Sequence, residues 1–206
     1  MAVLTGCLLA LSFSGCSSAP KKTPELSRLE GQKVALLDID GEETSRKVIE
    51  VALVNQLLNH GSFELVNKKD VENARTLPDV KPGDWRTLSE RSGATYGLRA
   101  KVLKFDADTR EGYSSEEVYD SQLAQERGEK EGKTRRLYKV KSLTGEVQIE
   151  LQFTEVKTGD VRTGVAEAKE TVTAESKDSA AHLPPKLRFL EELTNQAFKV
   201  FFDKYQ

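Results

Sequence analysis

The chain is poor in the residues that build metal and redox sites, with only two cysteines and two histidines among 206 residues. Cys7 and Cys16 both lie near the amino terminus, so the rest of the chain has no disulfide and no thiolate ligand. His60 and His182 have no partner at the spacing of a metal site or a catalytic triad. We therefore expect no metal ligands, no catalytic residues and no bound cofactor.

An excess of charge of one sign and a long apolar run are also missing. The formal net charge of -2 predicts no basic surface, and we expect no nucleic acid partner. The apolar run at residues 2–11 is shorter than the roughly 20 residues of a transmembrane helix. The remaining length is that of one domain with its own core.

The amino terminus has the pattern of a secretory signal peptide. Its apolar run is followed by the small residues Ser14 and Gly15, as at a signal cleavage site. The stretch Phe13-Ser14-Gly15-Cys16 resembles the lipobox of bacterial lipoproteins. That resemblance implies a diacylglyceryl group on the Cys16 thiol, cleavage just before Cys16 and acylation, for example by palmitate, of the new amino terminus. An unlipidated signal or an apolar amino-terminal helix is the alternative.

These features divide the chain into three parts. Residues 1–15 are predicted to be the lipoprotein signal peptide, and residues 16–30 the lipidated Cys16 with a flexible linker broken by Pro20 and Pro24. Residues 31–206 are predicted to be one folded domain. Ser17 resembles the signal for outer-membrane sorting, which implies a lipid anchor in the outer membrane and a body that faces the periplasm.

The first half of the domain alternates between strands and helices. Apolar residues 34–39 predict a strand covered on both faces. A largely buried helix is predicted at residues 46–60, capped by Thr44 or Ser45 and closed by Gly61. A strand at 63–66 and a short helix at 68–75 follow, and this order favours parallel pairing of the two strands. Asp84 is predicted to cap a helix over 85–92, before a third strand at 95–105.

The second half predicts a hairpin and a final helix. Val147, Ile149, Leu151 and Phe153 alternate with polar residues, and after a turn at 157–160 a second strand is predicted at 161–174. The helix that begins at Pro184-Pro185 has one apolar side, which favours packing on a sheet over contact with a membrane or an oligomer partner.

Residues 106–139 form a charge-rich insertion. Ser114 and Glu117 fit a capping box, which predicts a helix at 115–125, and a solvated loop is predicted after it. We favour a mobile insertion between strands, and a segment that binds a partner is the alternative.

The order of these elements resembles a family of bacterial envelope lipoproteins. It begins at Gly31-Gln-Lys-Val-Ala-Leu-Leu, continues through Phe63-Glu-Leu-Val-Asn-Lys-Lys and Tyr96-Gly-Leu-Arg-Ala-Lys-Val, and ends near Thr154-Glu-Val-Lys-Thr-Gly-Asp. This is similar to the periplasmic α/β domain of the curli secretion lipoprotein CsgG, a fold shared by PelC, LpoB and the amino-terminal domain of TolB. The resemblance covers residues 31–206, apart from the insertion.

The resemblance implies both a fold and a function. The fold is α/β, a single domain with a mixed β-sheet and helices packed on it, like an anticodon-binding domain. The function is non-enzymatic and serves assembly or export in the envelope, with another envelope protein or a homo-oligomer as partner. Activation of a penicillin-binding protein, as the likeness to LpoB implies, is the alternative within binding proteins.

An enzymatic alternative starts from the stretch Leu37-Asp38-Ile39-Asp40-Gly41, which resembles the opening motif of haloacid-dehalogenase-type phosphatases. In those enzymes the first aspartate attacks phosphorus beside Mg2+. Lys81 and Asp84 are the nearest further candidates, although Asp38 and Asp40 also fit the plain end of a strand. Trp85, the only tryptophan, is interpreted as a core anchor rather than a ligand platform.

Overall fold

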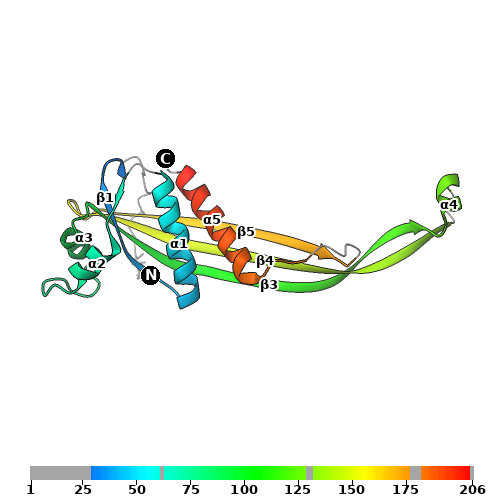
Figure 1. Cartoon of the computed structure of the whole chain (residues 1–206), viewed down its shortest axis with the longest axis horizontal. Helices are drawn as coiled ribbons and strands as arrows, with labels where there is room; N and C mark the ends of the chain where they lie inside the picture. The colour runs from blue at the N-terminus through cyan, green and yellow to red at the C-terminus, as the bar shows by residue number, and fades with distance from the viewer. Residues whose placement is uncertain (1–28, 61–62, 129–131, 177–181, 205–206) are drawn as a thin grey trace, which may run out of the picture.

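The computed structural model describes residues 29–60, 63–128, 132–176 and 182–204, which build one mixed sheet with helices on both sides (Figure 1). The five strands have the spatial order β2-β1-β3-β4-β5. They are β1 (Lys33–Asp40), β2 (Glu64–Leu65), β3 (Tyr96–Tyr119), β4 (Lys133–Glu155) and β5 (Val161–Glu175). β1 is parallel to β2 and β3, whereas β4 is antiparallel to both β3 and β5, so the expected mixed α/β fold is confirmed.

The helices divide between the two faces of this sheet. They are α1 (Glu43–His60), α2 (Lys68–Arg75), α3 (Trp85–Arg91), α4 (Gln122–Arg127) and α5 (Lys186–Lys204). α1 and α5 build the larger core together with β1, β3, β4 and β5, whereas α2 and α3 build a smaller one against the other face of β1. Val34 and Ile39 therefore enter the larger core, while Ala35 and Leu37 enter the smaller one. The prediction that β1 is covered on both faces is confirmed.

α5 lies across β4 and β5, as its apolar side predicts. Phe198 and Phe202 are fully buried on this side, whereas Leu187 and Val200 are exposed. Gly145 of β4 permits the close approach of α5, because a Cβ atom there would lie 2.6 Å from Leu193 Cδ1 and 2.8 Å from Phe189 Cε1.

α1 differs from its prediction at both its start and its burial. It begins at Glu43, so Thr44 and Ser45 lie in its first turn and do not precede it. Ser45 Oγ donates a hydrogen bond back to the Glu42 carbonyl. Val51 and Leu58 are exposed, so the helix is buried along one side only. Gly61, expected to close the helix, lies outside the described residues.

The charged insertion forms strands where a loop and a longer helix are expected. β1 pairs with β3 only as far as Lys101, and β5 pairs with β4 only from Val140 onward. Residues 113–119 and 133–139 continue beyond both as an antiparallel two-stranded ribbon, which we call the arm, with α4 near its tip (Figure 1). The helix predicted at 115–125 is wrong, because residues 115–119 belong to β3 and the helix is confined to 122–127.

Opposite charges hold the two strands of the arm together. Glu111 on β3 accepts from Lys139 Nζ at 2.6 Å and from Lys141 Nζ at 2.8 Å on β4. Lys133 Nζ lies 3.7 Å from Glu117 nearer the tip. A two-stranded ribbon is only marginally stable in water, and opposite charges on facing strands support it.

Glu111 gives the first testable prediction. Hydrogen bonds from Lys139 and then Lys141 lower the pKa of Glu111 to about 2. Because the folded-state pKa is lowered, this contribution to the arm is present above the ordinary glutamate pKa and is lost as the pH falls toward 2. We expect a carboxyl-carbon NMR titration to place the Glu111 midpoint near pH 2. Lys139→Met should move the midpoint upward. A wild-type midpoint at the ordinary glutamate value of about 4.3 would contradict these contacts.

Candidate docking groove at the open edge of β1

In the described part of the chain, one long edge of β1 has almost no neighbouring strand. β2 pairs with it only at Lys33 and Val34, whereas β3 pairs along the other side as far as Asp40. The Lys33 carbonyl accepts from Thr95 N at 2.8 Å, and the Val34 carbonyl accepts from Val66 N at 2.9 Å, so successive residues point their backbone groups to opposite sides. By this alternation Leu36 directs its backbone groups to the side that β2 no longer covers.

A groove of about 790 Å3 runs beside this edge, between β1, α1 and the start of α2. Leu36 of β1 and Val54 and Leu58 of α1 give it an apolar lining. Charged side chains from both helices complete the lining, among them Glu50 of α1 and Arg75 of α2. An apolar floor within a charged rim is the usual anatomy of a protein contact site.

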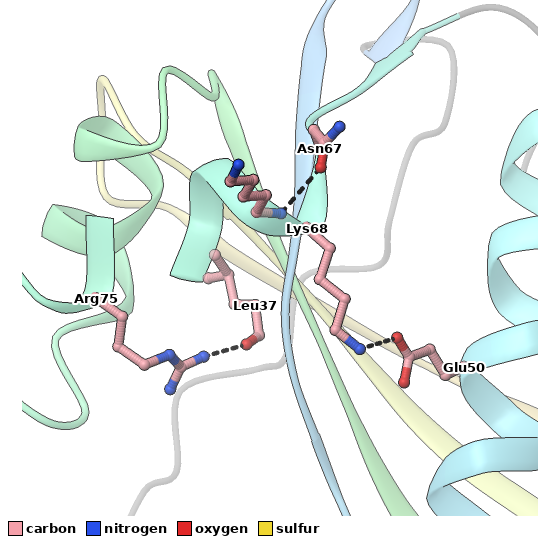
Figure 2. Close-up of polar contacts among 6 residues, drawn as sticks. Leu37, Glu50, Asn67, Lys68 and Arg75 are labelled. Carbon is pink, nitrogen blue, oxygen red and sulfur yellow. Dashed lines mark hydrogen bonds and ion pairs between the residues drawn. The ribbon is translucent and has the colours of Figure 1, made fainter. Parts of the chain in front are cut away.

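Arg75 interacts directly with the open edge. The pairing of β1 with β3 shifts register between Leu36 and Asp38, which is the mark of a bulge at Leu37. Arg75 Nη2 donates to the Leu37 carbonyl at 2.6 Å, and Figure 2 shows this side chain reaching from α2 to the strand. The guanidinium thus occupies an acceptor that the backbone N–H of an added strand would otherwise use.

α2 is held in place by its amino-terminal cap and its buried side. Asn67 Oδ1 accepts from Lys69 N at 2.9 Å, so the chain leaves β2 and turns at once into the helix (Figure 2). Val71 and Ala74 then pack in the smaller core with Leu37. This packing presents Arg75 and Lys68 to the groove.

An ion pair joins the two helices that form the walls. Lys68 Nζ lies 2.5 Å from Glu50 Oε1, so α2 and α1 are linked beside β1 (Figure 2). The hydrogen bond to Glu50 raises the pKa of Lys68, which keeps the amine charged. Within α1, Lys47 pairs with Glu43 at 2.6 Å.

Two guanidiniums of the lining have no carboxylate partner. The groove is lined by four cations, Arg46, Lys47, Lys68 and Arg75, and by three carboxylates, Asp38, Glu43 and Glu50. The two lysines pair with the two glutamates. Within the described part of the chain, Arg46 forms no ion pair and Arg75 bonds only a neutral carbonyl. The groove therefore retains a small positive surplus.

The residues of the phosphatase alternative are not brought together. Asp38 is half-buried and lines the groove, whereas Asp40 is exposed at the end of β1. Neither Lys81 nor Asp84 lines the groove. Asp84 instead caps α3 as predicted, accepting from Thr87 N at 3.1 Å and Thr87 Oγ1 at 2.8 Å, and these bonds lower the pKa of Asp84. In the described ranges no three histidine, cysteine or acidic side chains gather where they could hold a metal ion.

The other residues singled out in the sequence lie away from the groove or outside the described ranges. Trp85 is half-buried against the smaller core, and the Arg99 guanidinium carbon lies 4.1 Å from its ring centroid, in keeping with its interpretation as an anchor. His182 is exposed in the loop before α5. Cys16 lies outside the described residues, so its lipidation stays a prediction. None of the helices in the described ranges is long and apolar enough to cross a membrane.

Comparison with known proteins finds similarity at the level of structure. No protein-family model and no curated protein sequence matches the chain. Among solved structures, the PelC L103M dodecamer from Paraburkholderia phytofirmans is 14% identical with a TM-score of 0.37, and covers 86% of this chain and 92% of its own. The LpoB C-terminal domain from Escherichia coli is 13% identical with a TM-score of 0.40, over 69% of this chain and 85% of its own.

A third similar structure is the lipoprotein GNA1162 from Neisseria meningitidis, 9% identical with a TM-score of 0.40, over 84% of this chain and 99% of its own. PelC and LpoB are two of the proteins that the sequence resemblance names. At these identities the likeness concerns the fold alone.

Proposed function

We propose that this protein is a non-enzymatic lipoprotein of the outer membrane that faces the periplasm and serves envelope assembly or export by holding another envelope protein in the groove beside β1. The observation that carries the docking part is the open edge of β1 beside an apolar lining from α1. The lipid anchor rests on the lipobox resemblance at Cys16.

The composition of the groove supports binding of a polypeptide. Leu58 is a large apolar side chain that is 62% exposed, and a partner that covers it would remove its apolar surface from water. The ion pairs at the rim would orient such a partner and exclude unsuitable ones. These features suit recognition of a protein surface, whereas chemistry would need reactive groups that converge on one point.

Site-specific photocrosslinking in cells tests this proposal. A photoreactive amino acid at position 58 faces the groove, where Leu58 is 62% exposed. Position 59 is the matched control, because Asn59 lies next to Leu58 on the same helix and is exposed but does not line the groove. We expect a discrete adduct from position 58 and none from position 59. The captured protein, once purified, should bind wild type and lose about tenfold or more in affinity with Leu58→Glu, as expected when about 1.4 kcal/mol is lost from an interface.

The identity of the adduct separates the possible occupants. An adduct with another envelope protein supports the adaptor role, and an adduct of the chain with itself means that the groove is an interface between copies. Equal crosslinking from positions 58 and 59 would show that the groove is not the docking site. An affinity that Leu58→Glu and Asn59→Glu reduce equally would show the same.

A further inference from the structure

We infer that the segment held in this groove is an extended, acidic stretch of the partner that adds to the sheet as a strand beside β1. This inference rests on the proposed function, since it takes the groove as the docking site. It goes further by naming the conformation and the charge of the bound segment.

Among the described residues, the sheet leaves a position beside β1 open where such a strand would lie. β2 begins to occupy that position and pairs with two residues of β1 before Asn67 turns the chain into α2. Residues 35–40 of β1 continue past that point with no described strand on this side, and the groove runs along them. At about 3.3 Å per residue, this open position accommodates a short extended peptide. An exposed edge of this kind is a template for pairing with another chain.

Arg75 protects the edge in the free protein. Its bond to the Leu37 carbonyl and the bulge at Leu37 are both devices that keep an edge strand from indiscriminate pairing. Arg75 is exposed and carries a long side chain, so it can leave the carbonyl when a backbone N–H takes its place. The released guanidinium is then free to bind a carboxylate of the incoming strand, and such a charge-assisted bond is stronger than one to a neutral carbonyl.

The charges of the groove select the sign of that strand. Lys47 and Lys68 are already neutralised by Glu43 and Glu50. Arg46 has no ion pair in the described part of the chain, and Arg75 would lose its carbonyl partner on binding. Two guanidiniums against the single carboxylate of Asp38 favour acidic side chains, and Leu36, Val54 and Leu58 favour apolar ones. Because the side chains of a strand alternate between two faces, an alternation of valine and glutamate satisfies both requirements.

A labelled model peptide tests the inference directly. The probe is a capped heptapeptide of alternating valine and glutamate, measured by fluorescence anisotropy, and its lysine counterpart replaces every glutamate. We expect saturable binding of the glutamate peptide and at least about tenfold weaker binding of the lysine peptide, because like charges placed across an interface discriminate strongly. Arg46→Ala should lower the affinity for the glutamate peptide by up to about fivefold, as for the loss of an exposed ion pair.

Backbone methylation distinguishes strand addition from general adhesion. Alternate N–H groups of a strand point to the same edge, so methylation of the valine nitrogens blocks one edge and methylation of the glutamate nitrogens blocks the other. We expect only one of these two isomers to retain binding, and the bound peptide should slow hydrogen exchange of β1 amides at 36–39 without slowing that of α5.

Three outcomes would overturn the inference. The first is that the two N-methylated peptides bind equally well, and the second is that neither they nor the unmethylated glutamate peptide binds. The third is that the lysine peptide binds as tightly as the glutamate peptide. These outcomes are distinct from failure of the docking proposal. If position 58 crosslinks to an envelope protein while the peptide does not bind, the groove docks a partner that is not an added acidic strand.

Discussion

Replacement of Phe198 by alanine is expected to destabilise the fold by about 3–5 kcal/mol. Phe198 is fully buried on the side of α5 that faces the sheet, where Leu193 and Phe202 are also buried. Removal of its ring loses the transfer free energy of the ring atoms and leaves a cavity that the close packing of α5 on the sheet cannot fill. A loss of this size is a large part of the 5–15 kcal/mol that typically stabilises a domain.

Urea unfolding of the domain measures this loss, and Val200→Ala is the control. Val200 lies on the same helix and is exposed, so its truncation should change the free energy of unfolding by no more than about 0.5 kcal/mol. The two variants should unfold with the same slope in urea, because they expose similar surface on unfolding. If both variants lost similar stability, the orientation of α5 described above would be wrong.

The parts of the fold that could be predicted are those in which apolar spacing alone determines the structure. The apolar residues of β1 predict a strand buried on both faces, and two cores do cover it. The alternation from Val147 to Phe153 predicts one apolar face, and those four residues are buried in the larger core. Asp84 caps α3 as expected, since a capping carboxylate is a local signal.

The arm could not be predicted because its support comes from across the ribbon. Glu111 and Lys139 are far apart in the sequence, and nothing local indicates that they meet at 2.6 Å. Each strand read separately is a charged segment of the kind that usually remains in water. Only the facing strand reveals that opposite charges lie side by side.

The groove was missed for a related reason. Apolar residues 63–66 predict a strand that would cover this side of β1, and the apolar residues of α1 predict a buried helix. The structure pairs only Glu64 and Leu65 with β1, so Leu58 stays exposed beside an open edge. The sequence did contain a signal for the groove, because α1 has more apolar residues than the sheet can cover. Such a surplus is typical of a contact surface.

Cys16→Ser is expected to abolish fatty acylation of the protein and to remove the protein from the outer-membrane fraction. A serine hydroxyl does not accept the diacylglyceryl group in place of the thiol, and the cleavage and the second acylation that depend on this step then fail as well. Each buried CH2 contributes about 0.8 kcal/mol to membrane binding, so one chain binds only marginally while several hold the protein stably. The change therefore removes all acyl chains and leaves the signal peptide uncleaved.

Metabolic labelling with palmitate, followed by fractionation, measures the outcome. Cys7→Ser is the matched control, because Cys7 lies in the predicted signal peptide at 1–15 and is removed with it. The control should incorporate label and fractionate with outer membranes like wild type, whereas Cys16→Ser should incorporate no label, keep its signal peptide and be absent from the outer membrane. A Cys16→Ser protein that remained in the outer membrane with its signal trimmed would contradict the lipoprotein prediction. Without the acyl chains, the groove would no longer be confined to the outer-membrane surface, where confinement raises the effective concentration of two proteins.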